Sequence, residues 1–386
     1  MNYEITGSYL SKHESDKNLK PFLLLILSIV FIPAAYAFVA AVFIAQLIKG
    51  NLNIKVNKSS VLVYAYVAIG LTASDYKLIS AAYGLLIMLC FYSFRFFKTS
   101  SELKDFKKTK KLIFIVSLFV FAAGILQYFS PDFSIASKWV DTSEYNLNKR
   151  IYSTFFNPNV FGFYINFVIL LSCENLDFKK INLEWIAFMT GISCLVLTFS
   201  RAAWISLIAA LITSSFLDRK YIKYALIVSI AIFGADTLLG VGRVNPVKAA
   251  NDSSLLYRLE IWKASVEIIK DNFISGIGFG TLFKHIASYS SVVSTKIEHS
   301  HNLYLQILTE TGILGFSIFS TMIFNALKKL HSKLTEENNG IWITAFAVFV
   351  MTMAHGLVDS VPITPQIMMI LSIYAGTLTA STDSKI

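Results

Sequence analysis

Charged residues are scarce in this sequence. Only 15% of its 386 residues are Asp, Glu, Lys or Arg, whereas a soluble domain carries about 25%. Hydrophobic residues make up 55% of the chain, and the mean hydropathy is +0.60. A soluble fold of this size would have too little polar surface to cover itself, so a soluble globular domain is excluded. Lipid must replace water around most of the chain.

Cysteine is also rare, and the sequence shows no internal repeat. Cys90, Cys173 and Cys194 are the only cysteines, and all three lie in apolar stretches. They permit neither a disulfide framework nor the spacing of a zinc site, and they are expected to be small core residues.

The net charge of +10 has a different meaning here than in a soluble protein. In a soluble protein it would suggest a nucleic-acid partner or an anionic surface. Here the charges are confined to loops, so they indicate which side of a membrane each loop faces. No nucleic-acid partner is expected.

Long apolar segments dominate the sequence and predict an all-α fold, a polytopic integral membrane helical bundle that forms a single membrane domain over residues 1–386. Several segments are shorter than the about 20 residues of a perpendicular span, so we expect them to extend into their polar flanks. Residues 22–48 form either one helix kinked at Pro33 or two helices that turn there. The twelve segments are 22–32, 34–48, 61–72, 78–97, 112–129, 160–173, 183–199, 202–217, 221–239, 303–327, 341–356 and 363–379.

Lysine and arginine in the loops predict the orientation of these helices, because cytoplasmic loops carry an excess of both. About twelve helices with both termini inside place every basic loop on the cytoplasmic face. An eleven-helix arrangement that fuses the first two segments would put the N-terminal lysines outside. The predicted cytoplasmic segments are the N-terminal tail 1–21 and the loops 95–111, 179–180, 219–223 and 328–333.

The same orientation makes 130–159 and 240–302 two large periplasmic loops. Both mix acidic and basic residues. The second contains a predicted amphipathic helix at 254–271, whose apolar residues recur at helical spacing. The glycine-rich run 276–280 follows and predicts a turn close to the membrane.

Three arginines fall on the predicted outer face, where basic residues are uncommon. Arg201 lies in a tight turn between two apolar helices, Arg258 in the amphipathic helix, and Arg150 just before the rigid turn 157–159. A guanidinium group matches two oxygens of a diphosphate, so all three are candidate substrate-binding residues. The alternatives are a snorkelling arginine for Arg201, a pair with Glu260 or solvent for Arg258, and a surface charge for Arg150.

Two histidines open the apolar segment 303–327. Neutral imidazole can take a proton from a sugar hydroxyl near physiological pH, so His301 is a candidate general base. The positive end of the helix dipole would keep it neutral. A metal site at His299 and His301 is not expected, because no third ligand is evident and residues two apart diverge on a helix. An interfacial histidine is the alternative.

Two carboxylates also stand out. Glu310 lies within an apolar run, where a charge is costly and usually has a partner. On a straight helix it would face away from His301 and lie about 13 Å along the axis, so we expect a partner from another helix. Asp359, in the last outer turn, could orient a base, bind a sugar or simply shape the turn.

Residues 299–315 resemble the O-antigen ligase and O-antigen polymerase superfamily. They contain the pattern H-x-H-N followed by E-x-G-x-x-G. Three further stretches look like motifs of that family, and together they cover about residues 150–360. These stretches are Ser200 to Trp204, Arg150 with Asn157, Pro158 and Asn159, and Arg258 to Trp262 with the glycines at 276–280.

The resemblance implies an inverting glycosyltransferase without metal or cofactor, in the bacterial cytoplasmic (inner) membrane, with its active site facing the periplasm. Such enzymes move a glycan from undecaprenyl diphosphate to an acceptor hydroxyl. The implied partners are the undecaprenyl-diphosphate-linked glycan, an acceptor glycan or lipid A core, membrane lipid and a chain-length regulator. The predicted catalytic residues are His301 and Glu310, and the predicted substrate-binding residues are Arg150, Arg201, Arg258, His299 and Asn302.

The motifs leave the acceptor open. A polymerase adds the growing chain to another lipid-linked repeat unit, and a ligase adds it to lipid A core. The stretch 150–159 favours the polymerase. A transporter of lipid-linked sugars is the alternative from another class, but it would need charged residues deep in several helices or paired broken helices. The candidate residues gather at one predicted face instead.

Overall fold

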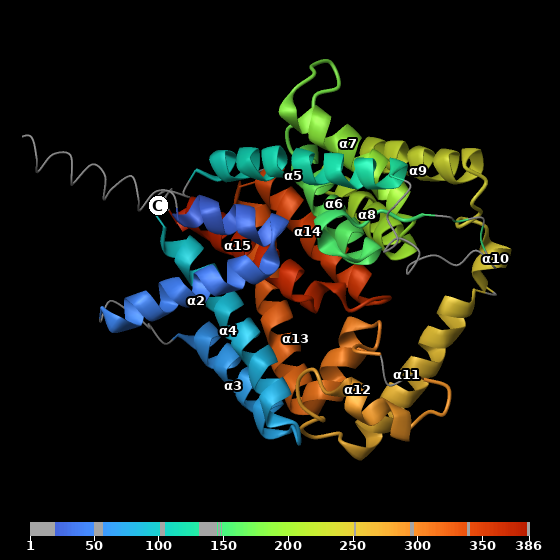
Figure 1. Ribbon diagram of the computed structural model, residues 1–386. Helices are drawn as coiled ribbons and strands as arrows, with labels where there is room; N and C mark the ends of the chain where they lie inside the picture. Colours follow the sequence, from blue (N-terminus) through green and yellow to red (C-terminus); the bar gives the residue numbers. More distant parts are fainter. Residues whose placement is uncertain are drawn as a thin grey trace, which may run out of the picture.

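The computed structural model describes residues 20–49, 57–100, 105–130, 145, 147, 149–250, 252–293, 297–337 and 340–383. These residues form helices joined by turns, and no strand occurs among them (Figure 1). The predicted tail 1–21 lies outside the described residues except for its last two positions, as do residues 131–144 of the first large loop.

Each of the twelve predicted segments coincides with a helix, so the all-α prediction is confirmed. Four helices are long and apolar enough to cross a membrane, namely α4, α5, α9 and α13, and the remaining apolar helices are shorter. The chain is thus a multi-pass membrane protein, while the number of about twelve spans stays a prediction. The helices are Lys20–Val30, α2 Ile32–Ile48, α3 Lys58–Thr72, α4 Lys77–Thr99, α5 Phe106–Phe129, η3 Ser153–Phe155, α6 Pro158–Cys173, α7 Leu183–Thr198, α8 Arg201–Ser215, α9 Lys220–Leu238, α10 Pro246–Ala250, α11 Ser253–Asp271, α12 Leu282–His285, η4 Ile286–Ser288, α13 Leu303–Glu337, α14 Gly340–Gly356, η5 Val361–Ile363 and α15 Pro365–Asp383.

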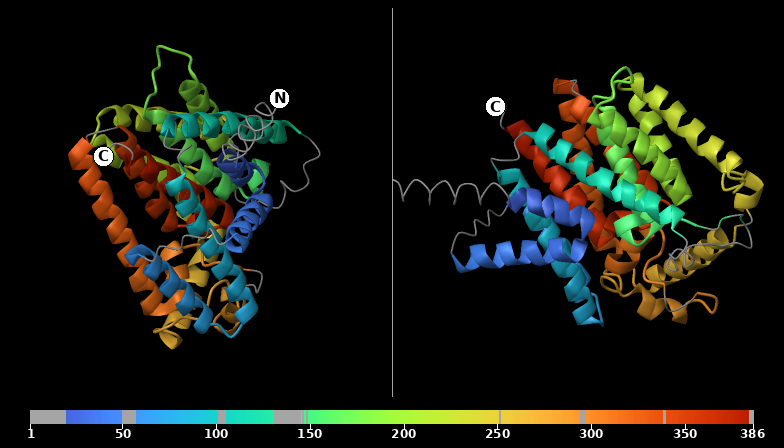
Figure 2. Two further views of the ribbon diagram at one scale, coloured as in Figure 1. Left: turned by 90° about the vertical axis from the view of Figure 1, so that its left-hand side faces the viewer. Right: turned by 45° about the horizontal axis from the view of Figure 1, so that its top comes forward.

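Residues 22–48 form two helices. Phe31 has non-helical angles, with φ −148°, and separates Lys20–Val30 from α2. Pro33 stands in the first turn of α2, where its missing N–H is tolerated. Figure 2 shows the two as separate helices joined by a sharp turn.

Helix α6 is the centre of the bundle. Every residue of α6 except Asn159 is buried. Helices α5, α7, α8 and α14 pack around it, and α3, α4 and α13 form the lower part of the molecule in Figure 1. Asn159 lies at the N-terminal end of this buried helix, which therefore fixes its position firmly.

The basic loops contact one another at one end of the bundle. Lys110, in the first turns of α5, donates to the Glu174 carboxylate over 2.8 Å, and Lys220 at the start of α9 donates to the Glu174 carbonyl oxygen over 3.0 Å. The candidate site residues lie at the opposite ends of these helices. This agrees with the predicted grouping of loops, while their assignment to periplasm and cytoplasm stays a prediction.

Helix α13 is broken at Gly312, where a single straight helix was predicted. Gly312 has φ +59°. The N–H groups of Ile313 and Leu314 donate to the carbonyl oxygens of Phe273 and Ile274 over 2.8 and 3.2 Å. A Cβ atom at Gly312 would lie 2.4 Å from the Ile274 oxygen, so only glycine fits there. Because Gly312 follows Glu310, this break leaves the helix between His301 and Glu310 unchanged. The straight-helix geometry predicted for that pair is wrong for another reason, since His301 precedes α13 and has φ +51°.

The described residues of segment 240–302 contain the predicted helix and the predicted glycine turns. Helix α11 begins one residue before the predicted start and ends at the predicted Asp271. Gly276, Gly278 and Gly280 all have positive φ, so the run forms a series of turns rather than a helix. These turns lie against Glu310 and Ser74, where a Cβ on Gly276 or Gly278 would clash.

Candidate functional site

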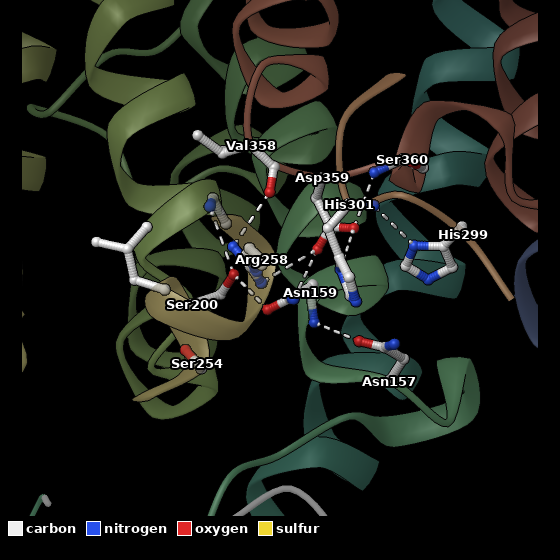
Figure 3. A network of polar contacts seen from close by, with 12 residues as sticks. Asn157, Asn159, Ser200, Ser254, Arg258, His299, His301, Val358, Asp359 and Ser360 are labelled. Carbon is white, nitrogen blue, oxygen red and sulfur yellow. Dashed lines mark hydrogen bonds and ion pairs between the residues drawn. The ribbon is translucent and has the colours of Figure 1, made fainter. Parts of the chain in front are cut away.

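Asp359 is the centre of a polar network at one end of the bundle (Figure 3). It lies between α14 and η5, and only 2% of its surface is exposed. Its carboxylate accepts hydrogen bonds from the Asn159 amide and the Ser360 N–H, both over 2.8 Å. His301 Nδ1 lies 3.3 Å from one oxygen, and the Arg258 guanidinium lies 3.8 Å from the other.

Asp359 is ionised despite its burial. Burial alone would raise the pKa of its carboxyl group. The hydrogen bond from His301 and the electrostatic interactions with His301, His299 and the Arg258 guanidinium outweigh this effect and hold the pKa well below its usual range. Asp359 is therefore a buried anion among cationic groups, and the interpretation as a mere turn residue is insufficient.

His301 precedes α13 instead of belonging to its first turn. It has a left-handed backbone with φ +51° and lies two residues before Leu303. Its ring is oriented by Asp359. In the tautomer whose Nδ1–H donates a hydrogen bond to that carboxylate, Nε2 is unprotonated and keeps its lone pair. The side chain remains 25% exposed, so Nε2 can meet a substrate.

His299 lies on the far side of His301 from Arg258 (Figure 3). The two imidazole rings have centroids 4.2 Å apart, and His299 Nδ1 accepts from the His301 N–H over 3.4 Å. Burial, followed by the charge of His301, lowers the pKa of His299 to about 4. His299 is thus uncharged at neutral pH, and the order in space is Arg258, Asp359, His301, His299.

Asn302, predicted to bind substrate, caps α13. Its Oδ1 accepts from the N–H groups of Tyr304 and Leu305, each over 3.0 Å, as expected of an N-cap asparagine. Its Nδ2 donates to the Leu357 carbonyl oxygen over 2.9 Å. Both ends of the amide are engaged in protein contacts, through which Asn302 holds the histidine segment against the segment that carries Asp359.

Arg201 forms the first turn of α8 and contacts a second buried anion. Its guanidinium pairs with Asp252 over 2.5 Å and donates to the Tyr145 hydroxyl over 3.1 Å. Arg243 approaches the same Asp252 oxygen to 3.5 Å and lies over the Tyr145 ring. Burial alone would raise the pKa of Asp252. Hydrogen bonds from Ser254 and Tyr145 and the charge of Arg201 outweigh burial and hold the pKa below its usual range, so the carboxylate stays ionised.

Arg150 belongs to the part of the network around Asn159 and lies close enough to Arg201 and Arg243 to interact with their charges. It donates to the Thr198 carbonyl oxygen over 2.7 Å and to Asn159 Oδ1 over 3.1 Å. The Ser200 hydroxyl donates to the same Asn159 oxygen over 2.9 Å, and Ser200 also caps α8. Asn159 in turn donates to Asp359. The structure thus brings the three predicted arginines and His301 close together at one end of the bundle.

The four arginines form a single cationic cluster. Burial and the positive charges of Arg243, Arg258 and Arg201 lower the pKa of Arg150. Three of these arginines form ion pairs with carboxylates, Arg201 and Arg243 with Asp252 and Arg258 with Asp359. The four guanidinium groups therefore lie beside two anions. This excess of positive charge favours an anionic ligand with several oxygens.

Glu310 lies outside this network, on the side of His299. It is 7% exposed, and its Oε1 accepts from the Gly280 N–H and from Gln306 Nε2, both over 2.7 Å. The predicted partner from another helix is therefore wrong, since these donors come from the glycine turns and from its own helix. Glu310 borders a cavity of about 260 Å³ between α3, α4, α13 and the start of α15, which His299 also lines.

A third possible metal ligand is present. His299, His301 and Asp359 offer ligand atoms within 4.8 Å of one another, so the reason given for expecting no metal is wrong. A divalent cation here would compete with the Asn159 amide and with Arg258, both of which already contact Asp359. It would also be repelled by the arginine cluster. The absence of a metal stays a prediction.

Sequence reasoning missed several members of the network. Asn159 was interpreted as part of a rigid turn and of a family-like motif but not as a site residue, and Arg243, Asp252 and Tyr145 were not singled out. One signal could have found the acidic residues: arginines on an outer face at the ends of apolar helices need counter-charges nearby. Tyr145 carried no such signal.

Comparison with known proteins agrees with the geometry. Residues 186–320 match the family model described as O-antigen ligase. The matched region contains Arg201, Arg258, His301 and Glu310, while Asp359 lies beyond it. No match was found among curated proteins. The match over residues 186–320 thus confirms the resemblance of this membrane protein to the O-antigen ligase and polymerase superfamily.

Proposed function

We propose that this protein is a surface-polysaccharide (O-antigen) polymerase. It is a metal-independent, inverting glycosyltransferase that moves a glycan from undecaprenyl diphosphate to a sugar hydroxyl of another lipid-linked repeat unit. One observation carries the proposal. An imidazole oriented by a buried carboxylate lies beside a cluster of four arginines, and all of them are held at one end of a membrane bundle.

The arginine cluster holds the diphosphate of the donor. Guanidinium groups match phosphate oxygens in bidentate geometry and are fixed here by the protein before the substrate arrives. As the bond between the anomeric carbon and the phosphate oxygen breaks, the leaving diphosphate takes the electron pair. Preorganised arginines stabilise that charge without rearranging.

His301 accepts the proton of the attacking hydroxyl. The acceptor oxygen forms a bond to the anomeric carbon from the face opposite the diphosphate, so the configuration inverts. The proton moves to His301 Nε2, and the resulting imidazolium is stabilised by Asp359. No nucleotide is needed, because the donor is already activated and resides in the bilayer.

The inner membrane is the proposed location, with the site facing the periplasm. The positive-inside distribution of Lys and Arg supports this orientation, since the basic loops lie at the end of the bundle away from the site. A transporter fits less well, because the polar network lies at helix ends and not along several helices.

A ligase that transfers the glycan to lipid A core is the second candidate. The description of the matched family favours it, whereas the stretch 150–159, which supplies Arg150 and Asn159 to the network, favours the polymerase. Deletion of the gene in the native host, followed by a gel of surface glycans, distinguishes the two. We expect lipopolysaccharide with a single repeat unit. Bare core with polymer retained on the lipid carrier would indicate the ligase.

The His301→Ala variant tests the chemistry common to both candidates. We expect glycan transfer to be lost while membrane insertion stays intact, because the base is gone and the fold does not depend on its ring. His331→Ala, at an exposed position near the other end of α13, is the matched control and should retain full activity. Full activity in His301→Ala would remove the assigned base.

A further inference from the structure

The cavity of about 260 Å³ is separated from the arginine cluster by the two histidines. Its volume approaches the about 300–1,000 Å³ of small-molecule pockets. Most of its wall is apolar and comes from α3, α4, α13 and α15, and the aromatic side chains of Tyr66 and Tyr83 are among its lining residues. Besides the two tyrosine hydroxyls, its polar side chains are Glu298, His299, Gln306, Glu310, Ser360 and Thr364.

Two of these polar groups have hydrogen-bonding capacity to spare. Both hydrogen bonds that Glu310 accepts from described residues go to Oε1, which leaves Oε2 for a ligand. The Ser360 hydroxyl is buried and has no hydrogen-bond partner within the described part of the chain. A buried polar group without a partner costs about 1–3 kcal/mol, so a ligand that bonds to these groups is favoured.

The charge of the cavity is opposite to that of the diphosphate site. The acidic side chains in the cavity wall are Glu298 and Glu310, and no Lys or Arg lines it among the described residues. Carboxylates in a mostly apolar wall repel phosphate and carboxylate groups. Hydroxyl groups, in contrast, can donate to them.

We propose that this cavity binds the terminal sugar of the acceptor and selects a sugar without negative charge. The inference rests on the proposed function and deepens it by naming the acceptor class. His299 and Ser360, at the polar end of the cavity, are the direct neighbours of His301 and Asp359. A sugar seated there presents a hydroxyl to the base from the side opposite the arginines, as inversion requires.

A polyprenyl chain is the competing occupant, and the polar groups argue against it. Hydrocarbon would leave both Glu310 Oε2 and the Ser360 hydroxyl without a hydrogen-bond partner. Sugar rings combine apolar faces that pack on tyrosine with hydroxyls that bond to carboxylate and hydroxyl groups. The cavity offers both kinds of surface.

The test fills the cavity from two walls. Ile87→Trp in α4 and Met322→Trp in α13 both place bulk into it. The controls Leu85→Trp and Phe324→Trp change exposed positions on the same helices. The probe is the lipid-free repeat-unit oligosaccharide, released by mild acid from lipid-linked glycan of the deletion strain. Its binding to the full-length protein in nanodiscs is measured together with binding of undecaprenyl diphosphate.

We expect the two cavity variants to bind the oligosaccharide at least about 10-fold more weakly, as a pocket obstructed by a large side chain does, with undecaprenyl diphosphate binding unchanged. The two controls should match the wild type. An equal oligosaccharide affinity in all variants, or weaker undecaprenyl diphosphate binding in the cavity variants alone, would overturn the inference.

A second measurement tests the selection by charge. Oxidation of primary hydroxyls on the oligosaccharide to carboxylates should weaken its binding at least about 10-fold, and Glu298→Gln should recover part of the loss. Equal binding of both probes would refute the selection. A protein that binds the neutral oligosaccharide but never transfers glycan would instead contradict the proposed function and leave this inference standing.

Discussion

Replacement of Asp359 by asparagine isolates the contribution of one buried charge. The asparagine keeps the shape of the side chain and can still accept from the Asn159 amide, so we expect the bundle to fold. It cannot stabilise an imidazolium at His301 Nδ1. A hydrogen bond to a charged group is worth about 1.5–3 kcal/mol, and each 1.36 kcal/mol is tenfold in rate. We therefore expect kcat to fall about 10- to 150-fold, with the 3.3 Å separation favouring the lower half of that range.

The assay is glycan transfer by purified protein in nanodiscs, with lipid-linked repeat units from the deletion strain as substrate. Asp271→Asn, at an exposed position on α11, is the control and should transfer at the wild-type rate. The double variant with His301→Ala should be no slower than His301→Ala alone, because the carboxylate acts through that ring. Wild-type kcat in a folded Asp359→Asn protein would refute the reasoning.

Three further predictions follow from individual residues. Arg201→Lys should lose most transfer activity, because a point charge cannot replace a bidentate fork, while Arg219→Lys at the opposite end of the bundle should not; normal rate in the former would remove the diphosphate clamp. Because the pKa of His299 is lowered in the folded protein, the unfolded chain binds a proton between about pH 7 and 5 that the folded protein does not bind. The wild type should therefore lose thermal stability as the pH falls through this range, and His299→Gln should lose less. Equal pH dependence of the two unfolding midpoints would contradict this. Gly312→Ala should lower the unfolding midpoint in detergent, since the alanine Cβ would clash with the Ile274 carbonyl oxygen. The left-handed backbone at this position would also cost about 1–3 kcal/mol of stability with alanine. An unchanged midpoint would contradict that clash.

Much of the helical architecture was predictable because a run of consecutive apolar residues indicates a helix without information from distant parts of the chain. The twelve segments correspond to helices, and the ends of α11 were placed to within one residue. Even the glycine turns at 276–280 could be predicted from composition. Each of these features depends on residues close together in the sequence.

The network around Asp359 depends on contacts between distant segments, and here prediction from the sequence reached its limit. Asn159 and Asp359 are 200 positions apart, yet their side chains share a hydrogen bond. The break at Gly312 has the same origin, because the glycine is required only once Phe273 and Ile274 pack against it. Glycine in the sequence permits such a break, but only the packed loop demands it.

The carboxylate of Asp252 has a consequence for turnover. It already pairs with Arg201 and Arg243, so under the proposed mechanism an arriving diphosphate must compete with an anion that belongs to the protein itself. That competition weakens binding of the substrate and of the spent carrier alike. After transfer, the same side chain can return to its guanidinium partners as the carrier departs, so the enzyme does not remain trapped with its own leaving group.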